Sequence, residues 1–237
     1  MGDFFYDDGT WSSDLREDKT CIGVVFYTGN PALHDESLKR EHPDCVNGLV
    51  IGAFADETNY WQSAVYDCGI SVGEWIGANV PSLMPPLTGT LEDDGLNRMV
   101  GFSNTQALIA FDADESNSGW PLEILDNFRE YQENSPVPPE SSSGWYIPSV
   151  KELSLLCSGE YDGNIWNMQM PDVSNLERVN ASLAKISRHS PIIGTSYYWS
   201  SSEYSALEAL GLDMLSGKVA YTVKDTYPWR IRCVLAF

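Results

Sequence analysis

One acidic segment, residues 112–123, has the residue types and the spacing of a calcium-binding loop. Its side-chain oxygens fall at positions 1, 3, 5 and 12 of that pattern: Asp112, Asp114, Ser116 and Glu123. The pattern fails at position 6, where Asn117 replaces the glycine that the sharp turn requires. We therefore expect an acidic, solvated loop that holds no metal, and calcium binding is the alternative.

Catalysis by a nucleophile, or by a bound metal, would need histidine or cysteine side chains that the sequence does not group. The three histidines, His34, His42 and His189, are isolated. None of the five cysteines forms a C-x-x-C pair: Cys21, Cys45, Cys68, Cys157 and Cys233. No glycine-rich phosphate loop occurs either. We expect no enzyme activity and no cofactor. The sequence leaves two alternatives undecided: a catalytic pair of carboxylates of the glycosidase type, and a disulfide between Cys21 and Cys45.

The composition fits one folded domain with an acidic surface. The chain has 237 residues, of which 43% are hydrophobic, and a formal net charge of −20. Such a charge repels phosphate backbones, so nucleic acid is an unexpected partner. The first residues lack the charged and apolar regions of a secretory signal. The protein therefore either stays inside the cell or begins after a removed leader.

The residue patterns predict strands, then helices. Apolar runs rich in β-branched and aromatic residues predict strands over residues 21–27 and 48–54, with a polar loop between them and irregular structure over residues 55–103. A serine followed three residues later by Glu or Gln predicts three helix starts, at Ser103, Ser149 and Ser174. A short helix over residues 122–132 and a surface connection over 134–144 complete this part.

The C-terminal part returns to strands. Residues 216–224 alternate, and Gly217 suits a hairpin turn. Residues 229–237 place their apolar side chains on one face: Ile231, Cys233, Leu235 and Phe237. We expect a single α+β domain over residues 1–237, in which the last strand, near residues 231–237, pairs with the strand over residues 21–27.

Three motifs follow one another in the second half of the chain. They are GWYIPSVKEL from Gly144, YWSSSEY from Tyr198 and RIRCVLAF from Arg230. This series, together with the opening GDFFYDDGTWS and the segment KTCIGVVFYTGN, resembles the C-type-lectin-like domains of surface and fimbria-associated proteins of gut Bacteroidales. It is most similar to the variable proteins of diversity-generating retroelements. The resemblance implies a C-type-lectin-like fold in its formylglycine-generating-enzyme-like variant, with antiparallel sheets and helices, as in the phage major tropism determinant.

In that family the ligand-facing segment corresponds to residues 199–237 and is diversified at asparagine codons. Residues 191–237 contain no asparagine, whereas the preceding residues contain thirteen. The resemblance implies these ligand-binding residues: Ser205, Leu207, Gly211, Asp213, Leu215, Ser216, Ala220, Tyr221, Thr222, Val223, Asp225, Thr226 and Tyr227. It implies a fixed scaffold made of these residues: Trp145, Trp199, Ser200, Ser201, Glu203, Gly217, Arg230 and Arg232.

The function expected from these patterns is ligand binding without catalysis. The calcium-lectin motifs E-P-N, Q-P-D and W-N-D are absent from the sequence, and so is a cysteine pair of the formylglycine-generating type. We expect a receptor or adhesin at the cell surface, outside the cell or on a phage particle, with a protein or another surface macromolecule as its ligand. The alternative is a structural subunit with fimbrial or surface-assembly partners, and a formylglycine-generating enzyme comes last.

Overall fold

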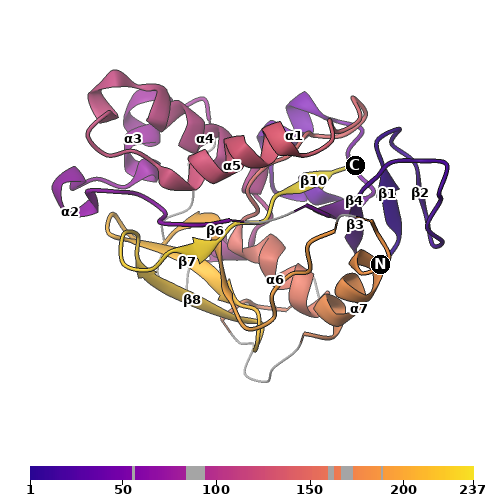
Figure 1. Cartoon of the computed structure of the whole chain (residues 1–237). Coiled ribbons are helices and arrows are strands. Elements are labelled where there is room, and N and C mark those ends of the chain that lie inside the picture. Colours follow the sequence, from indigo (N-terminus) through magenta and orange to yellow (C-terminus); the bar gives the residue numbers. More distant parts are fainter. Residues whose placement is uncertain (55–56, 84–93, 160–162, 167–172, 188) are drawn as a thin grey trace.

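Two five-stranded sheets organise the described part of the chain (Figure 1). The computed structural model describes residues 1–54, 57–83, 94–159, 163–166, 173–187 and 189–237. The first sheet has the order β10-β4-β3-β1-β2, with the bounds β1 Phe4–Tyr6, β2 Trp11–Ser12, β3 Cys21–Thr28, β4 Gly48–Gly52 and β10 Val234–Ala236. Its central strands β3 and β4 are buried on both faces, which explains their unbroken apolar sequences.

The second sheet carries the segment that follows the YWSSSEY motif. Its order is β5-β9-β6-β7-β8, with the bounds β5 Thr58–Asn59, β6 Tyr197–Glu203, β7 Glu208–Asp213, β8 Lys218–Val223 and β9 Trp229–Arg230. All of its pairs are antiparallel except β6 with β9, so the sheet is mixed. Strand β8 lies at one edge and corresponds to the strand predicted over residues 216–224, and the turn that contains Gly217 joins it to β7.

The last residues of the chain form two strands in different sheets. Strand β9 belongs to the second sheet, whereas β10 belongs to the first, where Val234 lies opposite Ile51 of β4. The predicted pairing of the last strand with residues 21–27 is therefore wrong by one strand, since β4 lies between them. Both faces of this segment are buried, in two hydrophobic clusters, so its alternation could not identify its neighbour.

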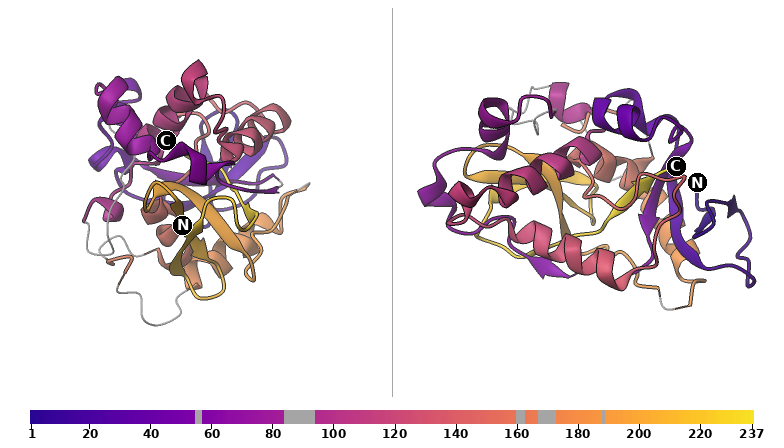
Figure 2. Two further views of the ribbon diagram at one scale, coloured as in Figure 1. Left: turned by 90° about the vertical axis from the view of Figure 1, so that its left-hand side faces the viewer. Right: turned by 90° about the horizontal axis from the view of Figure 1, so that it is seen from above.

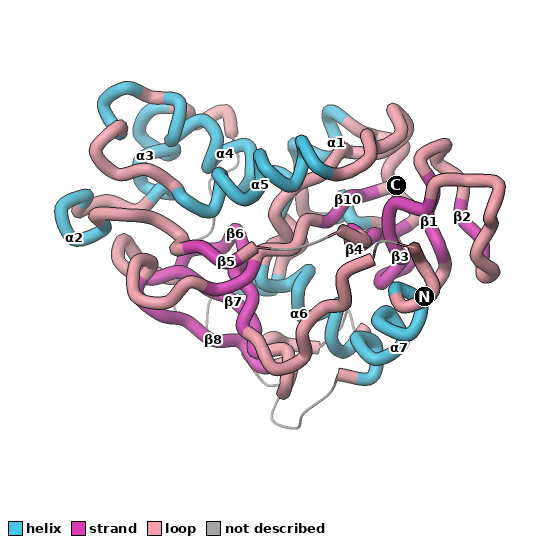
Figure 3. The backbone as a smooth tube through the Cα atoms, in the orientation of Figure 1, coloured by secondary structure: helices cyan, strands magenta, loops and turns pink. Residues whose placement is uncertain are grey.

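Seven α-helices and three short 3₁₀ helices are described. The α-helices are α1 Glu36–Glu41, α2 Val65–Cys68, α3 Val72–Asn79, α4 Gly101–Ala113, α5 Glu123–Asn134, α6 Val150–Ser158 and α7 Ser174–Leu183. The 3₁₀ helices are η1 Pro31–Leu33, η2 Asp94–Asn97 and η3 Glu115–Asn117. Helices α3, α4 and α5 lie on one side of the strands and α6 and α7 on the other (Figures 1 and 3). The fold is thus α+β.

The predicted helix starts meet three different outcomes. The capping box at Ser149 is confirmed, because Ser149 and Glu152 exchange hydrogen bonds at the start of α6. Helix α7 is present, but Val173 precedes it and Ser174 makes no cap. Helix α4 begins at Gly101, so the box at Ser103 is wrong; the Ser103 hydroxyl instead donates to Asp35, which caps α1. The helix expected over residues 122–132 is α5.

Two regions hold more structure than expected. The loop between the first two predicted strands contains η1 and α1, and the region expected to be irregular, residues 55–103, contains α2 and α3. Residues 55–56 and 84–93 of that region lie outside the described residues. None of the five cysteines forms a disulfide, and all are buried. Within the described ranges, every helix is too short or too polar to span a bilayer.

Both ends of the chain lie at the same end of the molecule, beside the first sheet, and the β7–β8 hairpin lies toward the other end (Figure 2). Helix α6 contacts strands of both sheets, β6 and β7 of the second and β3 of the first. This arrangement places the β7–β8 hairpin away from the termini.

Candidate functional site

Trp199 anchors the second sheet beneath the β7–β8 hairpin. Its side chain is fully buried, and its indole N–H donates to the carbonyl of Asn59 at 3.0 Å. Its ring lies 4.1 Å from the ring of Trp229, which in turn stacks on Tyr197 at 5.0 Å. Three aromatic side chains from β6 and β9 therefore form one column, and a column of this kind contributes both buried area and ring contacts.

The three serines after Trp199 bond to groups around them: Ser200 and Ser202 to backbone groups, and Ser201 to a side-chain amide. Ser200 Oγ donates to the Leu210 carbonyl at 2.7 Å and accepts from the Ser202 amide at 3.1 Å. Ser202 Oγ accepts from the Val150 amide, the first of α6, at 3.1 Å. Ser201 Oγ accepts from Asn104 of α4 at 3.3 Å. These bonds fix β6 to both flanking helices without side chains of the hairpin.

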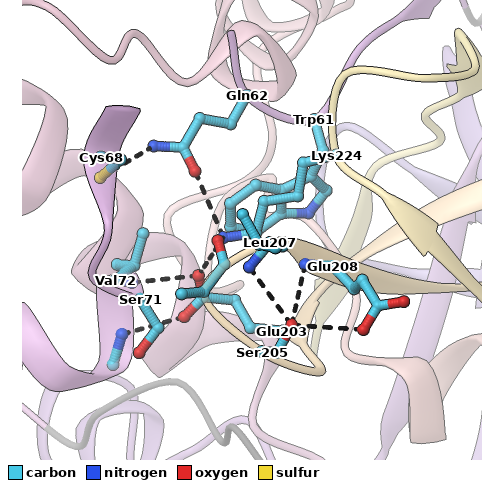
Figure 4. Close-up of polar contacts among 12 residues, drawn as sticks. Trp61, Gln62, Cys68, Ser71, Val72, Glu203, Ser205, Leu207, Glu208 and Lys224 are labelled. Carbon is cyan, nitrogen blue, oxygen red and sulfur yellow. Dashed lines mark hydrogen bonds and ion pairs between the residues drawn. The ribbon is translucent and has the colours of Figure 1, made fainter. Parts of the chain in front are cut away.

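Glu203 ends β6 and supplies a buried carboxylate to the first turn of α3 (Figure 4). It accepts from the amides of Val72 at 3.0 Å and Gly73 at 2.9 Å. These amides have no partner within the helix, and the dipole of the helix favours a negative charge there. Ser71 and Glu74 add a capping box at the same end. Glu203 thus joins two segments that lie 130 residues apart in the sequence.

Lys224 lies directly after β8 and neutralises Glu203 (Figure 4). Both side chains are fully buried, and their charged atoms lie 2.6 Å apart. The ammonium group also donates to the Ala206 carbonyl at 3.0 Å and to Gln62 Oε1 at 3.2 Å, and it lies 4.6 Å from the centre of the Trp61 ring. All three ammonium hydrogens therefore have an acceptor.

We call the buried group of Gln62, Glu203 and Lys224 the Lys224 cluster. Sequence reasoning missed Lys224, because a lysine in an alternating strand is normally on the exposed face. The cluster closes the segment from residue 203 to residue 224 at its base, where Lys224 N also donates to the Leu207 carbonyl at 3.0 Å. Since both charged side chains are enclosed, the cluster can hold the segment in place but cannot touch a substrate.

Two turns shape the segment that the cluster closes. Ser205 Oγ accepts from the amides of Leu207 and Glu208 at 3.2 and 3.1 Å. At the other end, the carboxylate of Asp213 accepts from the Leu215 amide at 3.0 Å and from the Ser216 hydroxyl at 2.7 Å. Gly217 follows with φ +68°, a left-handed conformation that suits glycine. The side chains of three candidate binding residues, Ser205, Asp213 and Ser216, thus also stabilise the turns.

Most of the candidate binding residues are accessible to solvent. Four apolar or aromatic side chains are exposed: Leu207 at 37%, Leu215 at 64%, Tyr221 at 45% and Tyr227 at 56%. Thr226 is exposed as well, and these residues are half-buried: Ser205, Asp213, Ser216, Ala220, Thr222, Val223 and Asp225. Exposed aromatic side chains beside small polar ones are typical of recognition surfaces.

The candidates do not share a single face of the hairpin. Successive strand residues point to opposite faces, so Tyr221 and Val223 lie on one side of β8 while Ala220 and Thr222 lie on the other. Tyr221 is opposite Leu210 in the ladder and stacks on Tyr204 at 4.5 Å. Both sides of β8 are partly accessible to solvent, because Tyr221 is exposed on one side and Ala220 and Thr222 are half-buried on the other.

Gly211 departs from the expected set because it is buried. A Cβ atom there would lie 2.3 Å from the Tyr198 carbonyl oxygen and 2.7 Å from the Trp229 ring. No larger residue fits without movement of the backbone or of Trp229. Gly211 therefore belongs to the frame, and its assignment as a ligand-binding residue is corrected.

The other scaffold residues contact parts of the frame outside the hairpin. Arg232 is fully buried and donates to the carbonyls of Gly52 and Ser190 at 3.0 and 3.2 Å. Trp145 is buried against Tyr131 of α5 at 5.5 Å. Arg230 lies in β9 opposite Thr58. These contacts lie away from the exposed part of the hairpin.

The acidic loop sends its oxygens to separate partners. Asp112 pairs with Arg129 at 2.7 Å, Asp114 accepts from the Ser116 amide at 2.9 Å, and Glu123 accepts from Ser63. Within the described ranges, no three His, Cys, Asp or Glu side chains are grouped so that they could hold a metal ion. Neither the loop nor the histidines form a site with the Lys224 cluster.

Comparisons with known proteins point to fimbriae. The chain is 27% identical over 227 residues to a curated Bacteroides ovatus protein with the provisional name fimbrium tip subunit Fim1C, an alignment that covers 86% of this chain and 38% of the relative. No protein-family model matches the chain.

A crystal structure of a fimbrial protein from Bacteroides ovatus has a similar fold. The two superpose with a TM-score of 0.77 at 23% sequence identity, over all of this chain and 48% of that one. The chain thus spans less than half of either protein. It is similar to fimbrial surface proteins in sequence and, at this level of identity, to the solved one in fold.

Proposed function

We propose that this protein is a subunit of a surface fimbrial assembly. The observation that carries the proposal is the similarity to a fimbrium tip subunit over 86% of the chain, together with the shared fold. This places the alternative from the sequence, a structural surface subunit, ahead of an independent receptor. The protein then acts at the cell surface, with other fimbrial subunits as its partners.

The β7–β8 hairpin supports a binding role for this subunit. Leu207, Leu215, Tyr221 and Tyr227 expose apolar and aromatic surface within one hairpin and its flanking turns. The buried Lys224 cluster fixes the base of the hairpin, so its exposed side chains can bind a ligand with little loss of conformational freedom. A protein or another surface macromolecule is the expected ligand, and the subunit acts as an adhesin without catalysis.

Three finer points extend the proposal. We propose that residues 1–237 form a single C-type-lectin-like domain, and the presence of the first and last strands, β1 and β10, in one sheet supports this. Residues 199–237 are written from a diversifying template, consistent with their lack of asparagine. The variable positions are the accessible candidates, without Gly211. A reverse transcriptase gene beside a near-copy of the coding sequence for residues 199–237 would establish this history.

Electron microscopy with gold-labelled antibodies against this chain tests the proposal. The host is a strain that carries the gene, and a gene-deleted strain is the control. We expect label on filaments outside the cells, and label confined to the cell interior would contradict the proposal.

A second experiment tests the binding role by measuring how strongly the same cells adhere to tissue surfaces. Tyr221→Ala with Tyr227→Ala should lower adhesion about tenfold, whereas Val137→Ala, at a residue 82% exposed outside the hairpin, should not.

A further inference from the structure

The outer edge of β8 has hydrogen-bonding groups that no described strand uses. Among the strands that the structure describes, β8 is the last of the second sheet and pairs with β7 alone. Its six residues, from Lys218 to Val223, are the length of an ordinary strand. An edge of this kind can accept a further strand.

The register of the ladder identifies the groups that point outward. Lys224 N donates to the Leu207 carbonyl, so in this antiparallel pair the backbone groups of Thr222 and Ala220 face β7. Those of Val219 and Tyr221 then face away from β7. Among the described residues, none forms a hydrogen bond with the outward amide or carbonyl of either residue. Farther along, the Val223 carbonyl accepts from the Thr226 amide, which limits the open edge to Val219 and Tyr221.

Side chains beside this edge would contact an added strand. Tyr221 is 45% exposed and is held by its stacking on Tyr204. Because its ring is already ordered, a neighbouring apolar side chain could pack on it without further ordering. On the opposite face Ala220 and Thr222 are small and would leave room for larger side chains.

The negative charge of the protein favours some partner strands over others. Glu208 and Asp213 lie opposite Val223 and Lys218 in the ladder and Asp225 follows shortly after β8, against one exposed lysine, Lys218, and the whole chain has a net charge of −20. A second copy of this acidic chain is repelled, whereas a positively charged segment is attracted.

We propose that the edge of β8 binds an extended, lysine- or arginine-containing peptide segment of a partner protein by strand addition. The segment would alternate basic and apolar residues, with its apolar side chains on the side of Tyr221. This inference rests on the proposed binding role of the hairpin and names the kind of ligand for it.

Amide hydrogen exchange, followed by NMR, tests the inference on the whole protein. The probe is a seven-residue peptide of alternating lysine and valine. We expect it to slow exchange of the Val219 and Tyr221 amides at least tenfold, while the Ala220 and Thr222 amides are protected with or without peptide. The same peptide with its edge-facing amides N-methylated keeps the charge but should not bind. Equal binding of both peptides, or no added protection at Val219 and Tyr221, would overturn the proposal.

Variants of the protein separate this inference from the proposed function. Val219→Pro removes an outward N–H group and leaves the inward bonds of β8 intact, so it should reduce peptide binding at least tenfold. Val219→Ala keeps the N–H group and should bind normally. If Val219→Pro lowers neither peptide binding nor adhesion while Tyr221→Ala lowers adhesion, strand addition fails and the binding role of the hairpin stands. Self-association that rises with protein concentration and is lost in Val219→Pro would identify a second copy as the occupant and overturn the proposed partner.

Discussion

At the scale of single residues, Gly211 separates the frame of the hairpin from its exposed part. The Trp229 ring lies directly over it, and Trp229 is held between Tyr197 and Trp199. A side chain at this position would displace the aromatic column on which the second sheet rests. Its neighbour across the ladder, Ala220, is half-buried and has no such constraint.

Gly211→Ala should therefore lower the free energy of unfolding by about 1–3 kcal/mol, as overpacking of a buried site does. Chemical denaturation measures the change. Ala220→Ser, directly opposite on β8, serves as the control and should change stability by less than about 0.5 kcal/mol. Equal stability of Gly211→Ala and the native protein would mean that Trp229 moves aside freely.

At the scale of elements, we expect the start of α6 to be sensitive to pH. Glu152 lies in the confirmed capping box, accepts from Tyr146 at 3.1 Å, and is buried. Burial raises the pKa of Glu152 from 4.5 to about 7, and the Asp35 carboxylate acts in the same direction. The folded protein thus holds a proton that the unfolded chain releases at lower pH. Stability from this group is present below about pH 4.5 and is lost as pH rises to about 7.

Glu152→Gln should remove this dependence, because the amide keeps an acceptor for the Ser149 amide and cannot ionise. Over this range the native protein should lose about 3 kcal/mol that the variant keeps. Melting temperatures at pH 5 and pH 8 measure the effect. Glu130→Gln, on the exposed side of α5, should behave like the native protein. Parallel pH profiles for the native protein and Glu152→Gln would show that Glu152 is already ionised at pH 5.

The elements also show how far the sequence predicts this fold. Strands β3 and β4 and helices α5, α6 and α7 follow from apolar runs and periodic patterns. The start of α4 does not, because Gly101 is required there by contact with α6: a Cβ atom would lie 2.2 Å from Glu152 Oε2. Helix α3 was missed although Ser71 and Glu74 form a capping box and Val72, Trp75 and Ile76 follow at helical spacing. The glycines at 73 and 77 lower the helix propensity of this segment, and Glu203 of β6 completes the helix start from a distant part of the chain.

The candidate site was likewise predicted only in part from the sequence. The accessible positions of the hairpin and the anchor Trp199 follow from the motifs and their alternation. Lys224 does not, because its burial depends on Glu203, Gln62 and the α3 amides meeting at one point. Sequence patterns along one strand contain no information about partners 21 and 162 residues away.

At the scale of the whole molecule, the Lys224 cluster joins the hairpin to α3 and to the segment before α2. Lys224→Met would leave Glu203 buried without its cation, so we expect a loss of about 3–5 kcal/mol of stability. Adding Glu203→Gln to that variant removes the uncompensated charge and should restore part of the loss. Lys218→Met, at the exposed start of β8, is the control and should have little effect on unfolding by denaturant. A Lys224→Met variant as stable as this control would mean that the hairpin does not depend on the cluster.

Because all five cysteines are buried, a cysteine introduced into the hairpin could be labelled selectively. Burial raises the pKa of the thiols of Cys21 and Cys45 to about 11, and it raises the pKa of Cys233 as well. Thiol reagents attack the exposed, ionised form, so the native protein is a poor substrate for maleimide dyes. A cysteine placed at Leu207 or Leu215, both exposed, would be the preferred target without removal of any native thiol. A fluorophore at either position could then report directly on what approaches this surface.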